Sequence, residues 1–187
     1  MKFLEQYSIK NSFKVDCKGK GKFAEDIFID YFNSNEKNHN KSLFDVRNTK
    51  DYQNKDIDFV IDNEGELVLP SVEEVLSNKE RYIKIEVKYS GPALRTGNFA
   101  FEVISHSRRG WGIKTECDYI FVVFIKDNKV NEYEIGKLGI IDFQKWMDFI
   151  DDKSNYTKVT VNKDENYVVD ILTKLDEMEK KGVLQYC

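Results

Sequence analysis

The segment at 119–125, YIFVVFI, is the feature that most restricts the fold of this chain. It is uninterrupted by polar residues, yet it is far shorter than the roughly 20 apolar residues that a membrane-spanning helix needs. Its aromatic and β-branched residues favour a strand, and a strand that is apolar on both sides belongs inside a sheet whose two faces are covered. We therefore expect a buried central strand and an α/β fold, in which helices flank a central mixed β-sheet.

Shorter segments with strand-like patterns surround this central one. Alternation of apolar and polar residues predicts strands at 56–61, 82–89 and 99–104. The chain should turn at Asp127 and Asn128, so that 131–135 returns as a hairpin partner of the central strand. A further strand is predicted at 156–162.

Helices are predicted where apolar residues recur at helical spacing or where a capping pattern begins. Ser71 followed by Glu74 has the capping-box spacing, which predicts a short helix over 71–79. The other predicted helices are 22–32, the segment around 143–150, and 168–178, the last of which Gly182 is placed to end.

Length and composition bound the class of protein. With 187 residues, of which 41% are hydrophobic, the chain suits one globular domain with a real core. It has no stretch long enough to span a membrane, and its first residues lack the apolar centre of a signal peptide. The 3 cysteines (Cys17, Cys117, Cys187) form no Cys-x-x-Cys pair and the chain has only 2 histidines, so we expect neither disulfides nor zinc, and a cytoplasmic location.

Charge is distributed unevenly along the chain. The net charge is −4, which does not by itself indicate a nucleic-acid-binding protein. Basic residues nevertheless gather in two places, where they are either phosphate contacts or an ordinary solvated surface. One group is Lys14, Lys18, Lys20 and Lys22; the other is Arg95, Arg108, Arg109 and Lys114, with His106 beside it.

The predicted strand at 82–89 carries acid and base on one side. Side chains alternate across a strand, so Glu86 and Lys88 share the face opposite to Ile85 and Val87. In the predicted strand at 56–61, Asp58 and Asp56 share the polar face. If the strands are neighbours, Asp and Glu converge on one site, and carboxylate oxygens are the ligands that Mg²⁺ prefers.

Lys88 would then lie beside such a cation. There it can orient a water or offset charge on a phosphate, and burial together with a nearby cation should lower its pKa. Glu25 adds a third carboxylate, because its helical neighbours Phe28, Ile29 and Phe32 are apolar. A carboxylate that points toward a core needs a partner or a cation; the alternative is a glutamate satisfied by ordinary hydrogen bonds or lying at the rim.

A helix with Glu25, a strand with Asp58, and then Glu86-Val87-Lys88 together resemble the PD-(D/E)xK, or restriction-endonuclease-like, nuclease superfamily. The resemblance covers about residues 20–125 and extends to poorly characterised phage and bacterial members through the run from Thr96 to Tyr119. It implies that Asp58 and Glu86 hold Mg²⁺ or Mn²⁺ with the Val87 carbonyl, that Lys88 serves the water, and that Glu25 supports the metal. It also implies a restriction-endonuclease-like core within a single domain at 1–187, with a helical and strand addition at about 126–187.

Several positions depart from the superfamily pattern or stay open. Ile57 stands where the motif has proline, and Asp56 competes with Asp58 as the ligand. Glu102 joins the carboxylates if 99–104 is the neighbour of 82–89; otherwise it is an exposed strand residue. Trp111 either stacks on a base or plugs the core, and Asp118 is either a turn residue or part of the site. No long helix separates the Glu-x-Lys strand from 119–125, so the usual second core helix is short, displaced or replaced.

The resemblance implies metal-dependent hydrolysis of phosphodiester bonds in DNA, with endonuclease action as the first expectation. DNA is the implied partner, and a homodimer is the implied assembly, since many nucleases of the superfamily are dimers. The main alternative is a nucleic-acid- or protein-binding module that keeps the nuclease fold without cleaving. A second alternative is a structural protein of a mobile element, whose carboxylates only line a wet sheet face.

Overall fold

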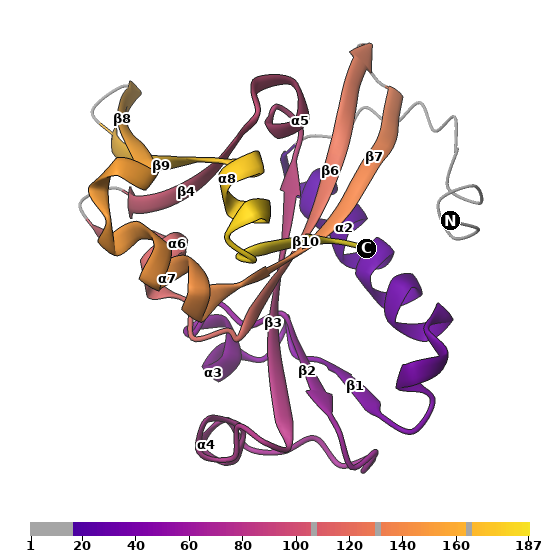
Figure 1. The fold of residues 1–187 in the computed structure, drawn as a ribbon. Coiled ribbons are helices and arrows are strands. Elements are labelled where there is room, and N and C mark those ends of the chain that lie inside the picture. The colour runs from indigo at the N-terminus through magenta and orange to yellow at the C-terminus, as the bar shows by residue number, and fades with distance from the viewer. Residues whose placement is uncertain (1–16, 106–107, 130–131, 164–165) are drawn as a thin grey trace.

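The chain is built on two β-sheets with helices around them (Figure 1). The computed structural model describes residues 17–105, 108–129, 132–163 and 166–187, and within these ranges the side chains of 17–18, 127–133 and 161–167 are not described. The first sheet has 6 strands in the order β1-β2-β3-β6-β7-β10, and the second has 4 in the order β5-β4-β9-β8. The prediction of an α/β fold with a mixed central sheet flanked by helices is confirmed.

The elements have the following bounds. The six-stranded sheet comprises β1 Ser42–Asp45, β2 Phe59–Asp62, β3 Tyr82–Ser90, β6 Tyr119–Lys129, β7 Glu132–Asp142 and β10 Leu184–Tyr186. The four-stranded sheet comprises β4 Asn98–Ser105, β5 Arg108–Arg109, β8 Tyr156–Lys163 and β9 Asn166–Lys174. The helices are α2 Cys17–Ser34, α3 Lys50–Gln53, α4 Val72–Ser77, α5 Ala93–Thr96, α6 Trp111–Lys114, α7 Phe143–Asp151 and α8 Leu175–Lys180, with 3₁₀ turns at Glu36–Asn38 and Lys153–Asn155. No helix among the described residues is long and apolar enough to cross a membrane.

Strand β6 is the buried central strand that the apolar run predicts. It pairs in parallel with β3 and antiparallel with β7. Phe121 and its alternate neighbours pack with α2, whereas Phe124 and its alternate neighbours pack with Trp146 of α7. Figure 1 shows α2 on one side of this sheet and α7, α8 and the second sheet on the other. Both faces are therefore covered.

The connection from β3 to β6 passes through the second sheet. It contains only the short helices α5 and α6, with β4 and β5 between them. The described part of this connection therefore contains no long helix, as the sequence indicates. Because β4 pairs with β5 and β9 rather than with β3, the condition under which Glu102 would join the carboxylates on β3 is not met. Glu102 instead faces Asp170 across the β4–β9 pair.

The C-terminal third contributes strands to both sheets. The predicted helix at 168–178 is wrong over its first part, because 166–174 is strand β9 and only Leu175–Lys180 is helical. Val169 and Ile171 are β-branched and pack against Val103 of β4, which favours a strand there. Gly182 follows α8 with φ of 70°, as a helix-ending glycine does. The turn predicted at Asp127 and Asn128 is also wrong, since β6 continues through both residues.

Strand β2 begins later than the sequence pattern predicts. It starts at Phe59, and Asp56 lies in the turn after α3 with a positive φ of 50°. Ile57 therefore packs with Val60 and not with Phe59. Period-two alternation does not hold across this turn, so the inference that Asp56 and Asp58 share one strand face is wrong.

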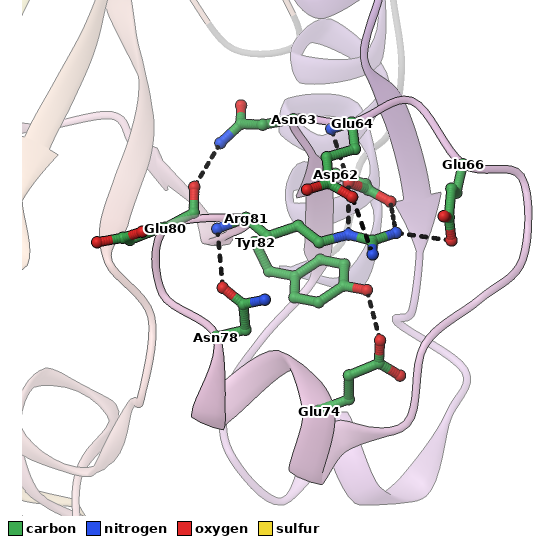
Figure 2. A network of polar contacts seen from close by, with 9 residues as sticks. All are labelled: Asp62, Asn63, Glu64, Glu66, Glu74, Asn78, Glu80, Arg81 and Tyr82. Atoms are coloured by element: carbon green, nitrogen blue, oxygen red, sulfur yellow. Dashed lines mark hydrogen bonds and ion pairs between the residues drawn. The ribbon is translucent and has the colours of Figure 1, made fainter.

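The loop between β2 and β3 is fixed by ion pairs around Arg81 (Figure 2). The Arg81 guanidinium contacts the carboxylate of the fully buried Asp62 at 2.8 Å and also pairs with Glu64 and Glu66. In the same loop, the Ser71 hydroxyl accepts a hydrogen bond of 3.2 Å from the Glu74 N–H, which confirms the predicted helix start. This network sets the position from which β3 begins.

Candidate active site

Two hydrogen bonds to the backbone of β3 hold Asp58 in place, one made by its backbone and one by its side chain. Its backbone N–H donates to the Ile85 carbonyl at 2.9 Å, and its carboxylate accepts from the Val87 N–H at 2.8 Å. The N–H and C=O of one strand residue point to the same side, so the Val87 carbonyl also faces the side of Asp58. The structure thus brings together the Asp and the strand carbonyl named from the sequence.

Glu86 lies on the face of β3 opposite to Ile85 and Val87, as alternation predicts. The residue is 4% exposed. Its Oε1 accepts a hydrogen bond from the Lys88 ammonium. Its Oε2 is buried and has no hydrogen-bond partner among the described residues. A buried carboxylate oxygen in this state is destabilising unless a cation or a proton satisfies it.

Electrostatics at this carboxylate pair favour protonation or a cation. Burial raises the pKa of Glu86 to about 8, and the nearby Asp58 charge adds to the effect, while Lys88 opposes it. Burial also raises the pKa of Asp58, although the Val87 N–H, Lys88 and a side-chain hydrogen bond with Glu86, which a protonated Glu86 can donate, lower it. The positive charge near these acids therefore does not offset their burial.

The lowered pKa expected of Lys88 assumes a bound cation beside it, and without such a cation the pKa of Lys88 is raised. Burial alone would lower the pKa of its ammonium, but the carboxylates of Glu86, Asp58 and Asp56 outweigh burial and raise it. The ammonium also lies 4.7 Å from the centre of the Trp111 ring. Lys88 is accordingly held as a cation.

Asp56 reaches the same region from the turn before β2. Its charge raises the pKa of both Glu86 and Lys88. Its Oδ2 is buried and lies 3.2 Å from Lys114 Nζ, yet it takes part in no hydrogen bond of acceptable geometry. The backbone carbonyl of Asp56 accepts from the Thr115 hydroxyl at 2.8 Å. Asp56 is therefore a neighbouring carboxylate with an incompletely satisfied oxygen.

Glu25 has a charged partner, and no described contact joins it to the acid on β3. It forms an ion pair with Arg47, which also pairs with Asp45. The Arg47 guanidinium lies 5.0 Å from the centre of the Phe59 ring, and its charge lowers the pKa of Asp58. Arg47 is thus a basic residue near the site that the sequence reasoning missed. It lies in the turn after β1, where no periodic pattern marks it.

The predicted nucleic-acid contacts differ in their surroundings. Arg108 and Arg109 are exposed on β5, and Arg95 is exposed in the last turn of α5. Lys114 is partly exposed and pairs with Asp56. His106 and Lys14, like the side chain of Lys18, lie outside the described residues.

Asp118 and a nearby cleft occupy another part of the same sheet face. The Asp118 carboxylate accepts from the Lys84 backbone N–H at 2.8 Å and pairs with the Lys84 ammonium at 2.9 Å. A cleft of about 720 Å³ opens beside this pair, lined by Lys84, Glu116, Asp118 and Phe143 among others. Asp58, Glu86 and Lys88 do not line it. We place the candidate chemistry at the carboxylates of Asp58 and Glu86, because buried acids with strongly perturbed pKa values gather at functional sites.

The residues at this site supply only some of the ligands that a divalent cation needs. Among the described residues, no group of three or more His, Cys, Asp or Glu side chains is arranged to hold a metal. Asp58 and Glu86 form a pair of buried acids, with the unpartnered Glu86 Oε2 beside them and the Val87 N–H bound to Asp58. Such oxygens suit Mg²⁺, which keeps several waters and takes only one or two carboxylates from a protein.

Comparison with known proteins identifies no relative. The chain matches no family model, no curated protein and no solved structure.

Proposed function

We propose that this chain is a metal-dependent nuclease that hydrolyses phosphodiester bonds in DNA, on a core of the restriction-endonuclease-like type. The observation that carries the proposal is the buried, unpartnered Oε2 of Glu86 beside the carboxylate of Asp58. Burying acids of one sign together costs stability, and a chain usually tolerates that cost where a cation or a reaction uses it. The order of a helix with Glu25, Asp58 before a strand, and Glu-x-Lys on the next strand supports the same assignment.

Asp58 and Glu86 would hold Mg²⁺ or Mn²⁺ with the Val87 carbonyl. When bound, such a cation supplies polarisation of a phosphate oxygen and lowers the pKa of a water. Lys88, held as an ammonium by Glu86, would stabilise the negative charge that develops on the phosphate and orient the attacking water. Glu25 would act through Arg47, which pairs with Glu25 and whose charge lowers the pKa of Asp58.

The proposed substrate is DNA because exposed basic residues lie close in sequence to α6, which contacts the site. Arg108 and Arg109 precede Trp111 and Lys114, whose side chains contact Lys88 and Asp56. Arginine side chains on a strand edge suit contacts with phosphates, which provide affinity and register. We propose the cytoplasm as the location, and a second copy of the chain as the partner that lets both strands be cut.

A binding module without cleavage is the second candidate. The observation that favours it is the absence, among the described residues, of a complete metal-ligand cluster. Mn²⁺ binding separates the two candidates, because a retained nuclease site should bind the cation and Glu86→Gln should weaken that binding. Nucleic-acid binding that is indifferent to Mn²⁺ and to Glu86→Gln would favour the module.

The proposal is tested by incubating the purified chain with supercoiled plasmid, linear duplex, single-stranded and branched DNA in Mg²⁺ or Mn²⁺, beside matched EDTA controls. We expect cleavage that requires the cation, and nicking of the circular plasmid would establish endonuclease action. A well-folded wild type that binds DNA but cuts none of these substrates would overturn the proposal in favour of the binding module.

A further inference from the structure

We infer that Trp111 is a positioning residue, which fixes the Lys88 ammonium between the face of its indole ring and the carboxylate of Glu86. The ammonium lies 4.7 Å from the ring centre and also donates to Glu86 Oε1. A cation over the face of a tryptophan is attracted by the ring quadrupole, most strongly when both are shielded from water. This inference deepens the proposed function and rests on it for the role of Lys88.

The indole ring is itself fixed by the second sheet. It packs against Phe101 and Phe99 of β4, with ring centres 5.5 Å and 6.4 Å away. Trp111 belongs to the partly buried residues around the core that contains Trp146 and Phe124. An anchored ring loses little further freedom when it orders a lysine side chain, so it lowers the entropic cost of holding the ammonium in one place.

Close backbone approach on both sides of Trp111 fixes the backbone that carries its ring. A Cβ at Gly110 would lie 2.3 Å from the Glu102 carbonyl oxygen, and one at Gly112 would lie 2.9 Å from Phe101 Cβ. Only glycine fits at these positions, so α6 is pressed directly against β4. The second sheet therefore carries Trp111 to a defined position over a lysine of the first sheet.

The contact also bears on the alternatives that the sequence left for Trp111. The face of the ring that covers Lys88 is not available for stacking on a base, and the ring packs with the core. Lys114 and Thr115, which follow in the chain, contact Asp56. The segment 110–115 thus contacts the candidate site at both Lys88 and Asp56, and its role is to order those groups.

Trp111→Phe and Trp111→Leu form the matched pair that tests this role. Phenylalanine keeps a ring face for the cation, whereas leucine keeps only apolar packing. We expect the single-turnover cleavage rate at saturating DNA to fall by about fivefold or more in the leucine variant and by less in the phenylalanine variant. The DNA dissociation constant should change by less than about twofold in both, because phosphate contacts supply most of the affinity.

A second measurement needs neither metal nor cleavage. The rate at which an amine-acylating reagent labels Lys88 at one fixed pH, followed by peptide mass spectrometry, reports how firmly its ammonium group is held. Labelling should be about threefold faster in Trp111→Leu and less than that in Trp111→Phe, since the ring covers and attracts the cation. If Trp111→Leu does not fold, as judged by circular dichroism, Trp111→Met replaces it in both measurements.

Equal behaviour of the phenylalanine and leucine variants in both measurements would overturn the positioning role and leave Trp111 as core packing. A wild type that cuts no DNA would overturn the proposed function alone, because the labelling comparison still decides whether Trp111 holds the Lys88 ammonium. An active wild type, together with an unchanged rate of Lys88 labelling in both variants, would overturn only the role of Trp111.

Discussion

The side-chain carboxylate of Asp58 accepts a hydrogen bond of 2.8 Å from the backbone N–H of Val87. Val87 lies between Glu86 and Lys88, so this contact ties the residue before β2 to the strand that carries the other acid and the lysine. The donor is main chain and cannot move without distorting the sheet. The position of the Asp58 carboxylate relative to β3 is therefore set by the fold before any ligand arrives.

Asp58→Asn separates the charge of this carboxylate from its hydrogen bond. The amide oxygen can still accept from Val87, so we expect the folded state to persist, with a Mn²⁺ affinity lower by on the order of 100-fold. Titration calorimetry measures the affinity. Asp58→Ala is the matched control, because it also leaves the Val87 N–H unpaired and should cost about 1–3 kcal/mol of unfolding free energy. Unchanged Mn²⁺ binding in Asp58→Asn would remove Asp58 from the site.

The raised pKa of Glu86 predicts a pH-dependent stability in the absence of divalent cations. Between the ordinary value of 4.5 and the folded value of about 8, the folded state keeps a proton that the unfolded state has released. The unfolding free energy should therefore fall as pH rises through this window. Burial raises the pKa of Asp58 as well, which gives the same sign.

Urea denaturation in EDTA at a series of pH values measures this slope. Glu86→Gln should flatten it, whereas Glu179→Gln, which changes an exposed glutamate in α8, should leave it unchanged. Adding Mg²⁺ should raise stability more at the upper end of the window than at the lower end, because the cation competes with the proton. A wild type whose stability does not fall between these pH values would contradict the assigned burial of Glu86.

The Lys84–Asp118 ion pair should contribute to stability and not to catalysis. The Lys84 side chain is 3% exposed, so removal of the Asp118 charge leaves a buried ammonium without its partner. We expect Asp118→Asn to lower the unfolding free energy by about 3 kcal/mol. Glu134→Gln, which breaks the exposed pair with Lys126, should cost less than about 1 kcal/mol. Similar small losses in both variants would show that Lys84 finds another partner.

Arg108 and Arg109 are predicted to contact phosphates rather than bases. Replacing both with Ala should weaken DNA binding similarly for all sequences and reduce the slope of log affinity against log salt concentration by about 2. Fluorescence anisotropy across a salt series measures both effects. Lys37→Ala, which removes an exposed cation from the 3₁₀ turn after α2, serves as the control. An unchanged slope in the double variant would exclude this strand from the DNA interface.

Local periodicity predicts some of these elements correctly and misplaces others for physical reasons. The apolar run of β6 and the alternation of β3 result from burial on one or both faces of the strand. Such burial is visible in the order of apolar and polar residues within the segment itself. The segment that forms β9 has apolar spacing compatible with a helix. It forms a strand because it pairs with β4, which lies far away in the chain. At Asp56 a positive φ breaks the alternation, and no pattern of side-chain polarity signals such a turn.

The candidate site divides in the same way. The shared face of Glu86 and Lys88 follows from strand geometry alone and is confirmed by their contact. The Arg47 pair with Glu25 and the position of Trp111 over Lys88 depend on how α2 and the second sheet pack on the central sheet. Such contacts join distant segments, so a single sequence does not reveal them.

The most direct test of the proposed chemistry compares wild type with Lys88→Met for Mg²⁺-dependent nicking of supercoiled plasmid. Urea denaturation first establishes that both proteins are folded under the assay conditions. Methionine keeps much of the apolar stem and removes the ammonium. We predict metal-dependent nicking by the wild type and a rate at least about 100-fold lower in the variant, with DNA binding largely retained. Nicking by Lys88→Met at the wild-type rate would contradict the account, because the Glu86–Lys88 pair would then have no part in the reaction.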